Sequence, residues 1–195
     1  MTRTIKLAAL APALLLGGCL SLGGGEAPDS LLTLTPVTMA PAGTGASGTQ
    51  ADALALSEFE VPKSLDVTRI PVQVSDTEIA YLQDAVWVER PARLFRRLLA
   101  ETVRTRSGRV VIDGDDPGVG ASDRLQGTLR AFGYDARTRE AVVTFDAVRN
   151  GVGSAVTTRR FEARVPVAAP ETAFVGPALN RAANDVAGQV AAWLE

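Results

Sequence analysis

The pattern of residues 1–18 predicts a leader, which would limit the folded part of the chain to the residues after position 18. Thr2, Arg3 and Lys6 give a polar and positively charged start, and an almost unbroken apolar run extends from 7 to 16. This run is far shorter than the roughly 20 apolar residues that a membrane-spanning helix needs. A charged start, a short apolar run and small residues at the cut are typical of a secretory signal peptide. We therefore predict that residues 1–18 are a signal peptide.

The only cysteine of the chain, Cys19, stands directly after the small residues at which this leader would be cut. The stretch Leu16-Gly17-Gly18-Cys19 resembles the lipobox of bacterial lipoproteins. The resemblance implies a diacylglycerol on the Cys19 thiol, cleavage after Gly18, and acylation of the new amino terminus with palmitate. A single free thiol in a secreted chain calls for such an explanation. The alternative is an ordinary signal peptide followed by a chance cysteine.

The composition after the leader argues against several kinds of function. Removing Arg3 and Lys6 leaves 18 basic residues (20 minus 2) against 22 acidic ones, a net charge of −4. A nucleic-acid-binding domain would carry a clustered basic face instead. The chain has no histidine, which is the commonest general base and metal ligand. We therefore expect no enzyme activity, no metal site, no cofactor and no nucleic acid partner.

The residues after the cut divide into a short tether and one domain. The segment 19–30 contains three successive glycines and is predicted to be a flexible tether. About ten residues reach at most about 35 Å, which keeps the domain close to its membrane. The residues 31–195 are enough for one domain with its own core. Without a disulfide framework, that core must hold the domain by burial alone.

Four short strands are predicted in the first half of the domain, at 30–35, 53–61, 69–74 and 78–82. Apolar residues alternate in the third strand, so that Ile70, Val72 and Val74 face one way. Pro71 has no N–H to donate to a ladder, which indicates an edge strand or a strand start. The segment 37–52 is rich in Ala, Gly, Thr, Ser and Pro without periodicity, and we predict a mobile loop there.

Two helices and a meander complete the domain. One helix begins at Pro91 and ends near Gly108, and the other runs from about Glu171 or Gly176 to Trp193. Between them lie a strand at 109–112, a turn at 113–118, three long strands at 125–134, 140–149 and 157–167, and hairpin connections at 135–139 and 150–153. This order predicts an α+β two-layer domain in which a mainly antiparallel sheet packs against two helices.

The segments before the first helix resemble one family. The stretch from Tyr81 through Trp87 to Pro91 and the pattern Pro-x-x-Leu-Asp-x-x-x-Ile at 62–70 are similar to those of the ABC-type transport auxiliary lipoproteins, the PqiC-like family. The resemblance extends in order over nearly all of the chain after Cys19. One departure is the predicted first strand, where the family usually has a tyrosine and this chain has Leu31 and Leu32.

The resemblance implies a non-catalytic periplasmic subunit. Such lipoproteins accompany an ABC ATPase, a permease and an MCE-domain substrate-binding protein in systems that move lipids between the inner and outer membranes. The lipoprotein would dock on the MCE protein at the outer-membrane end and could form a homo-oligomeric ring. Leu20, which comes directly after Cys19, is compatible with sorting to the outer membrane.

Two other functions remain open at this point. The first is a stand-alone envelope lipoprotein that binds a small apolar ligand between the sheet and the helices. The second is a periplasmic hydrolase, which is poorly supported because a serine nucleophile would lack a histidine base. Asp113, Asp115 and Asp116 only superficially resemble a calcium loop, since Pro117 occupies the next alternate position.

Four residues are candidates for binding a partner: Trp87, Arg90, Arg93 and Arg97. Tryptophan and arginine are enriched at interface hot spots. In the alternative interpretation, Trp87 caps the core and Arg90 pairs with a local acid such as Glu89 or Asp84. The arginines of the first helix, Arg93, Arg96, Arg97 and Arg104, could also meet anionic headgroups or an acidic partner, or form a solvated face.

Overall fold

The computed structural model describes residues 30–114, 121–151, 153 and 155–195. The predicted signal peptide, Cys19 and the tether up to residue 29 lie outside this part of the chain. Within it, the elements come in the order β1 (Leu54–Leu56), η1 (Lys63–Leu65), β2 (Arg69–Gln73), β3 (Ile79–Val86), α1 (Pro91–Ser107), β4 (Val111–Asp113), β5 (Asp123–Asp135), β6 (Glu140–Asn150), β7 (Val156–Pro166) and α2 (Thr172–Leu194).

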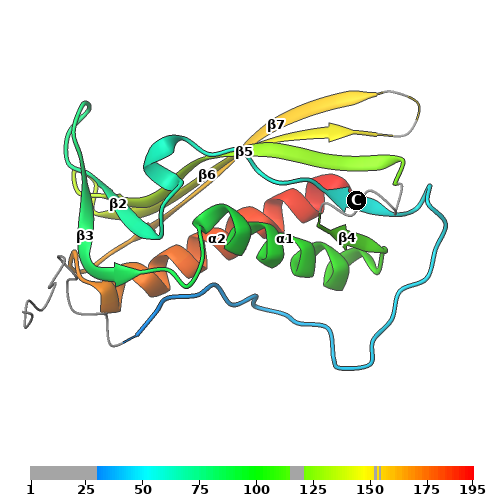
Figure 1. Ribbon diagram of the computed structural model, residues 1–195, viewed down its shortest axis with the longest axis horizontal. Helices are drawn as coiled ribbons and strands as arrows, with labels where there is room; N and C mark the ends of the chain where they lie inside the picture. Colours follow the sequence, from blue (N-terminus) through cyan, green and yellow to red (C-terminus); the bar gives the residue numbers. More distant parts are fainter. Residues whose placement is uncertain (1–29, 115–120, 152, 154) are drawn as a thin grey trace, which may run out of the picture.

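These seven strands form one mixed sheet around the meander β5-β6-β7 (Figure 1). β6 pairs antiparallel with β5 on one side and with β7 on the other, along nearly its whole length. The other edge of β5 carries two short extensions. β1 pairs in parallel with the start of β5 and with β4, whereas β2 pairs in parallel with the end of β5 and antiparallel with β3. The predicted α+β class is confirmed. The long strands β5, β6 and β7 pair antiparallel, whereas the short strands β1 and β2 pair with β5 in parallel.

Both helices lie on one side of the sheet (Figure 1), as the sequence predicted. α1 ends at Ser107 and is capped by Gly108, which has a φ of 66° and so adopts the left-handed conformation that glycine tolerates best. α2 begins at Thr172 rather than at Gly176. Its buried face is rich in alanine, which allows close approach to the sheet. Among the described residues, no helix combines the length and the hydrophobicity needed to cross a bilayer.

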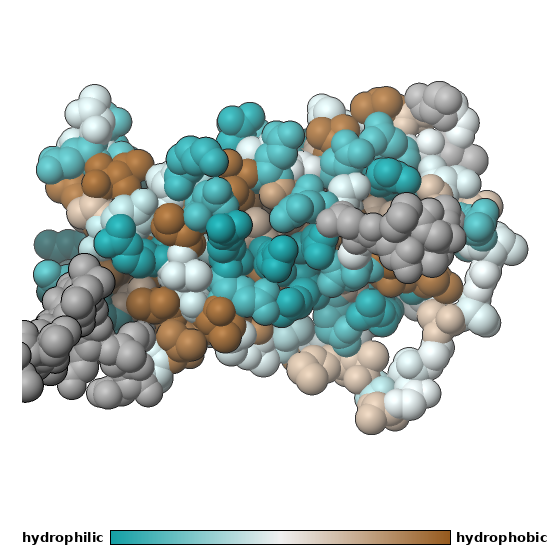
Figure 2. All heavy atoms as spheres, in the orientation of Figure 1, coloured by the Kyte–Doolittle hydropathy of each residue, from teal (hydrophilic) through white to brown (hydrophobic). Residues whose placement is uncertain are grey.

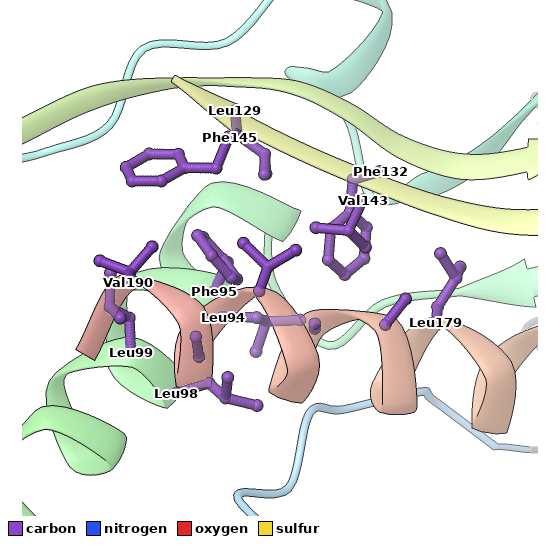
Figure 3. Close-up of a cluster of buried hydrophobic side chains, with 14 of the residues drawn as sticks. Leu94, Phe95, Leu98, Leu99, Leu129, Phe132, Val143, Phe145, Leu179 and Val190 are labelled. Carbon is purple, nitrogen blue, oxygen red and sulfur yellow. The ribbon is translucent and has the colours of Figure 1, made fainter. Parts of the chain in front are cut away.

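The core lies between the helices and the inner face of β5 and β6. Side chains from α1, α2, β5 and β6 meet there (Figure 3). The ring of Phe145 lies 4.6 Å from that of Phe59 and 5.3 Å from that of Phe95, between ring centroids. Tilted and edge-to-face pairs of this kind stabilise a core beyond the area that they bury. The apolar faces of the meander strands and of α1 thus pack together in one core.

The prediction of a strand at 30–35 is wrong, because these residues form no regular secondary structure. Within the described residues this segment makes one parallel bridge, between Leu32 and Trp87. Both main-chain groups of Thr35 are bonded by side chains of α2 instead. We call residues 31–40 the N-terminal strap. The strap runs extended along the helices (Figure 1), and its Leu32 and Leu34 pack against the core.

Side chains of both helices hold the strap. The Thr35 N–H donates to Asn180 Oδ1 at 2.8 Å, and the Val37 N–H donates to Asn184 Oδ1 at 2.9 Å. Further along, the N–H of residue 40 donates to Glu101 Oε1 at 2.7 Å. The two asparagines are four residues apart and therefore share one face of α2. The predicted loop at 37–52 contains no helix or strand, and its mobility stays a prediction.

The placement of Pro71 corrects a second prediction. β2 lies between β3 and β5 and is not an edge strand. The proline is tolerated because the pairing is irregular there: Arg69 pairs with Val86, whereas Pro71 pairs with Tyr81. The extra residues form a bulge in β3, where Asp84 has a φ of 52°. Proline inside a sheet is found at such bulges.

A buried carboxylate closes the end of the sheet near β1 and β4. Asp123 accepts hydrogen bonds from Arg149 at 3.0 and 2.8 Å and from Arg109 at 2.9 Å. Burial alone would raise the pKa of Asp123, but the bonds from Arg149 and Arg109 outweigh burial and hold the pKa below its usual value. The carboxylate therefore stays ionised and joins β5, β6 and the segment before β4.

Candidate partner-binding surface

Trp87 lies in the core and does not reach the surface. Its side chain is 1 % exposed, and its ring packs edge-on against Phe132 with 5.5 Å between centroids. The Trp87 N–H of the main chain donates to Thr68 O at 2.8 Å. Within the described residues its indole Nε1 has no hydrogen-bond partner. The structure therefore supports the packing role that the sequence left open for Trp87.

Arg90, Arg93 and Arg97 are exposed at the start of α1. Arg90 pairs with Asp66 at 3.4 Å, an acid distant in sequence, rather than with Glu89 or Asp84. Arg97 pairs with Glu89 at 2.9 Å. These are solvent-exposed pairs, which contribute little to stability. The three arginines remain available to a partner.

The other two arginines of the predicted helix face have internal partners. Arg96 lies 2.9 Å from Asp113 and joins α1 to β4, with side-chain exposures of only 15 % and 21 %. Arg104 pairs with Glu101 at 2.5 Å and donates to the carbonyl of Val111 at 3.4 Å. Arg96 and Arg104 thus bind groups of the domain itself, whereas Arg93 and Arg97 are exposed to solvent.

Two exposed apolar residues lie beside the exposed arginines. Leu31 is 52 % exposed and Val88 is 50 % exposed, and the Val88 N–H donates to Leu32 O at 2.8 Å. Figure 2 shows hydrophobic side chains gathered at the lower left, where the strap passes the end of β3 and the start of α1. We call Leu31, Val88, Arg90, Arg93 and Arg97 the tether-side surface.

The sheet face turned away from the helices is polar and paired. Asp146 accepts hydrogen bonds from Arg160 at 2.5 and 2.7 Å and from Arg130 at 2.8 Å. The Arg160 guanidinium, with help from Arg130, lowers the pKa of Asp146 to about 2. Glu162 similarly accepts from Arg164 at 2.7 Å. In β7 the charged residues Arg160, Glu162 and Arg164 thus share this outer side, whereas Phe161 is buried on the other.

A cleft of about 380 Å³ opens on this outer face, lined by residues of η1, β2, β5 and β6. Pro71 and Gly133 approach closely at its wall, because a Cβ on Gly133 would overlap the Pro71 carbonyl oxygen. Arg137 at the rim is bonded to Asp135 and Asp76 and lowers the pKa of Asp135 to about 2. In this cleft Arg137 therefore forms ion pairs with both Asp135 and Asp76.

The ligand-binding alternative requires space between the sheet and the helices. Phe95 and Phe145 fill that space together with leucine and valine side chains (Figure 3). In the described part of the chain, the interior is thus a packed core. The same residues also contain no cluster of acids, cysteines or histidines that could hold a metal ion. Asp115 and Asp116 lie outside the described residues, and Asp113 pairs with Arg96.

Sequence reasoning missed the residues that hold the strap, Asn180, Asn184 and Glu101. A signal was present, because two asparagines four residues apart stand in a helix that is otherwise rich in alanine. Such spacing places both amides on one face. The pattern could not indicate what they bind, since their partners lie about 145 residues earlier.

Known proteins share this sequence pattern and this fold. The family model described as ABC-type transport auxiliary lipoprotein component matches residues 32–191. The fold is similar to the crystal structure of protein XCC0632 from Xanthomonas campestris, of family DUF330, with a TM-score of 0.69 and 17 % identity over 85 % of this chain and 94 % of that chain. It is also similar to the crystal structure of an uncharacterized protein, with a TM-score of 0.65 and 13 % identity over 85 % of this chain and 100 % of that chain. No match was found among curated proteins.

Proposed function

Because the chain belongs to the family of ABC-type transport auxiliary lipoprotein components, we propose that it is the lipid-anchored accessory subunit of an MCE-type ABC transport system. In this proposal the subunit faces the periplasm, has no catalytic role and supports lipid movement between the inner and outer membranes. The family match carries the proposal, because it starts at residue 32, shortly after the lipobox, and continues to residue 191.

The proposed mechanism is architectural. Cys19 carries the lipid, the tether sets the distance from the bilayer, and the domain docks on the MCE-domain substrate-binding protein. Leu20 supports an outer-membrane position, and a homo-oligomeric ring would let lipid pass through its centre. The paired charges support a structural role, since Asp123, Asp146 and Arg96 each join separate elements of the domain.

An affinity pull-down of the chain from detergent-solubilised envelopes tests this proposal. Mass spectrometry of the recovered proteins should find an MCE-domain protein, and with it the ATPase and permease. A second tagged envelope lipoprotein, treated in the same way, controls for capture by the lipid alone. Recovery of the chain by itself, from envelopes in which other complexes survive, would contradict the proposal and favour a stand-alone lipoprotein.

A further inference from the structure

We propose that the tether-side surface, formed by Leu31, Val88, Arg90, Arg93 and Arg97, rests on an anionic phospholipid bilayer. The inference rests on the proposed function, because it takes Cys19 as the lipid-bearing residue. It names the partner of the candidate residues Arg90, Arg93 and Arg97 as a membrane surface rather than a protein.

The backbone geometry turns the two apolar residues outward together. Leu32 and Trp87 face each other in a parallel bridge and point toward the core. Side chains alternate along extended segments, so the neighbours Leu31 and Val88 point to the outside of the same layer. Both are half exposed. The bonds from the Leu32 N–H to Val86 O and from the Val88 N–H to Leu32 O hold the two segments side by side, so both apolar side chains are already presented outward.

The charges around this pair are of the sign that an anionic surface attracts. Arg90 comes two residues after Val88, and Arg93 and Arg97 lie further along the first two turns of α1. Asp66 pairs with Arg90 and with Lys63, and Glu89 pairs with Arg97. Four basic residues against two acids leave a local charge of +2, on a chain whose net charge after removal of the leader is −4. Basic residues near an anionic leaflet each strengthen binding.

The course of the chain brings this surface to the membrane. The structure begins at Ser30, next to Leu31, and Cys19 lies eleven residues earlier in the sequence. That length spans at most about 40 Å, so a lipid on Cys19 keeps this end of the domain at high local concentration beside the bilayer. An apolar pair bordered by basic residues is the combination that interfacial membrane contacts use.

A single-thiol experiment tests the inference. Cys19 is the only cysteine, so acylation leaves a Val88→Cys variant with one free thiol for a fluorescent label. The matched control is Thr157→Cys, an exposed residue of β7 at the opposite edge of the sheet from β3. Each purified, acylated protein is placed in vesicles of phosphatidylethanolamine and phosphatidylglycerol that contain a lipid-borne quencher, and thermal unfolding confirms that both variants fold.

We expect strong quenching at position 88 and little at position 157. Replacing Arg90, Arg93 and Arg97 with Gln should weaken the bilayer contact about fivefold per arginine and reduce quenching at position 88. Equal quenching at both positions, with the protein still held by the vesicles, would overturn the inference while leaving the anchor intact. An unmodified Cys19, detected by mass spectrometry, would instead contradict the anchor and the bilayer contact together.

Discussion

The side-chain amide of Asn184 donates a hydrogen bond to the main-chain carbonyl of Thr35 at 3.0 Å. The same side chain accepts a bond from the Val37 N–H at 2.9 Å. An asparagine amide offers one acceptor and two donor hydrogens, so it can satisfy a peptide group as a neighbouring strand would. This is why the N-terminal strap lies extended along α2 without joining the sheet. The segment that leads to the predicted anchor is therefore held by helix side chains.

Replacing Asn184 with Ala should release the strap. Two hydrogen bonds to the strap would be lost, at about 1 kcal/mol each, together with one to the Asn180 carbonyl within α2. The higher helix propensity of alanine partly offsets this loss. We expect the free energy of unfolding to fall by about 1 kcal/mol and the Val37 amide to exchange faster. Hydrogen exchange and thermal unfolding measure both effects. Arg181→Ala, on the exposed side of α2, is the control, and unchanged exchange at Val37 would count against the role of Asn184.

Trp87→Ala should destabilise the domain by about 3 to 5 kcal/mol, the cost of emptying a core site of this size. Trp87→Phe should cost less, because it keeps an aromatic ring against Phe132 and removes an indole N–H without a partner. Arg93→Ala should change stability by less than about 0.5 kcal/mol. Urea unfolding compares the three variants. A Trp87→Ala protein of normal stability that no longer binds its transport partner would show that Trp87 is a docking residue after all.

Gly127→Ala should destabilise β5. A Cβ at this position would overlap the Asp146 carbonyl oxygen and lie 2.5 Å from the Phe145 ring. Overpacking of this kind costs about 1 to 3 kcal/mol. The matched variant Gly188→Ala, where nothing lies within 4 Å of the new Cβ, should gain about 0.5 to 1 kcal/mol from helix propensity. Equal melting temperatures for the two variants would refute the close contact.

Stability should fall in acid because of the paired carboxylates. The pKa of Asp146 is about 2 in the folded protein, against a usual value of 3.8, because of Arg160 and then Arg130. A lowered folded pKa means that the unfolded chain binds protons first, so the contribution is complete above about pH 5 and is lost as the pH falls through 3.8 toward 2. Melting temperatures measured across this range should drop.

The variant Asp146→Asn identifies the source of that drop. It should melt at a lower temperature than the parent at pH 7 and lose less on acidification, since its side chain cannot ionise. Asp185→Asn, on the exposed side of α2, should keep the parental pH dependence. If Asp146→Asn follows the parental curve throughout the acid range, other carboxylates are responsible.

Cys19→Ala tests the anchor directly. The domain should remain folded, because its core is complete within the described residues, and it should leave the membrane fraction for the soluble periplasmic fraction. Immunoblotting of fractionated envelopes measures the distribution. Retention of the variant on the membrane would refute anchoring through Cys19.

Local patterns allowed much of the architecture to be predicted. Strand length and β-branched or aromatic residues indicated β5 and β6, alternation of apolar and charged residues indicated β7, and helical periodicity between Pro91 and Gly108 indicated α1. Such patterns involve only residues a few positions apart. They arise wherever a core buries one face of a helix or strand, so they can be recognised without the tertiary structure. The lipobox and the segment from Tyr81 to Pro91 likewise indicated the family, which the match over residues 32–191 bears out.

The sequence by itself determined the two helices, the three long strands, the fold class and the family. Tertiary structure alone decided that Trp87 is buried, that Arg96 and Arg104 turn to internal partners while Arg93 and Arg97 stay outside, and that Thr35 is held by Asn180. The physical reason is that each of these depends on contacts between elements, and Thr35 and Asn180 are 145 residues apart. Periodicity shows that a face is polar, but only the packed fold decides which polar groups meet each other and which meet the surroundings.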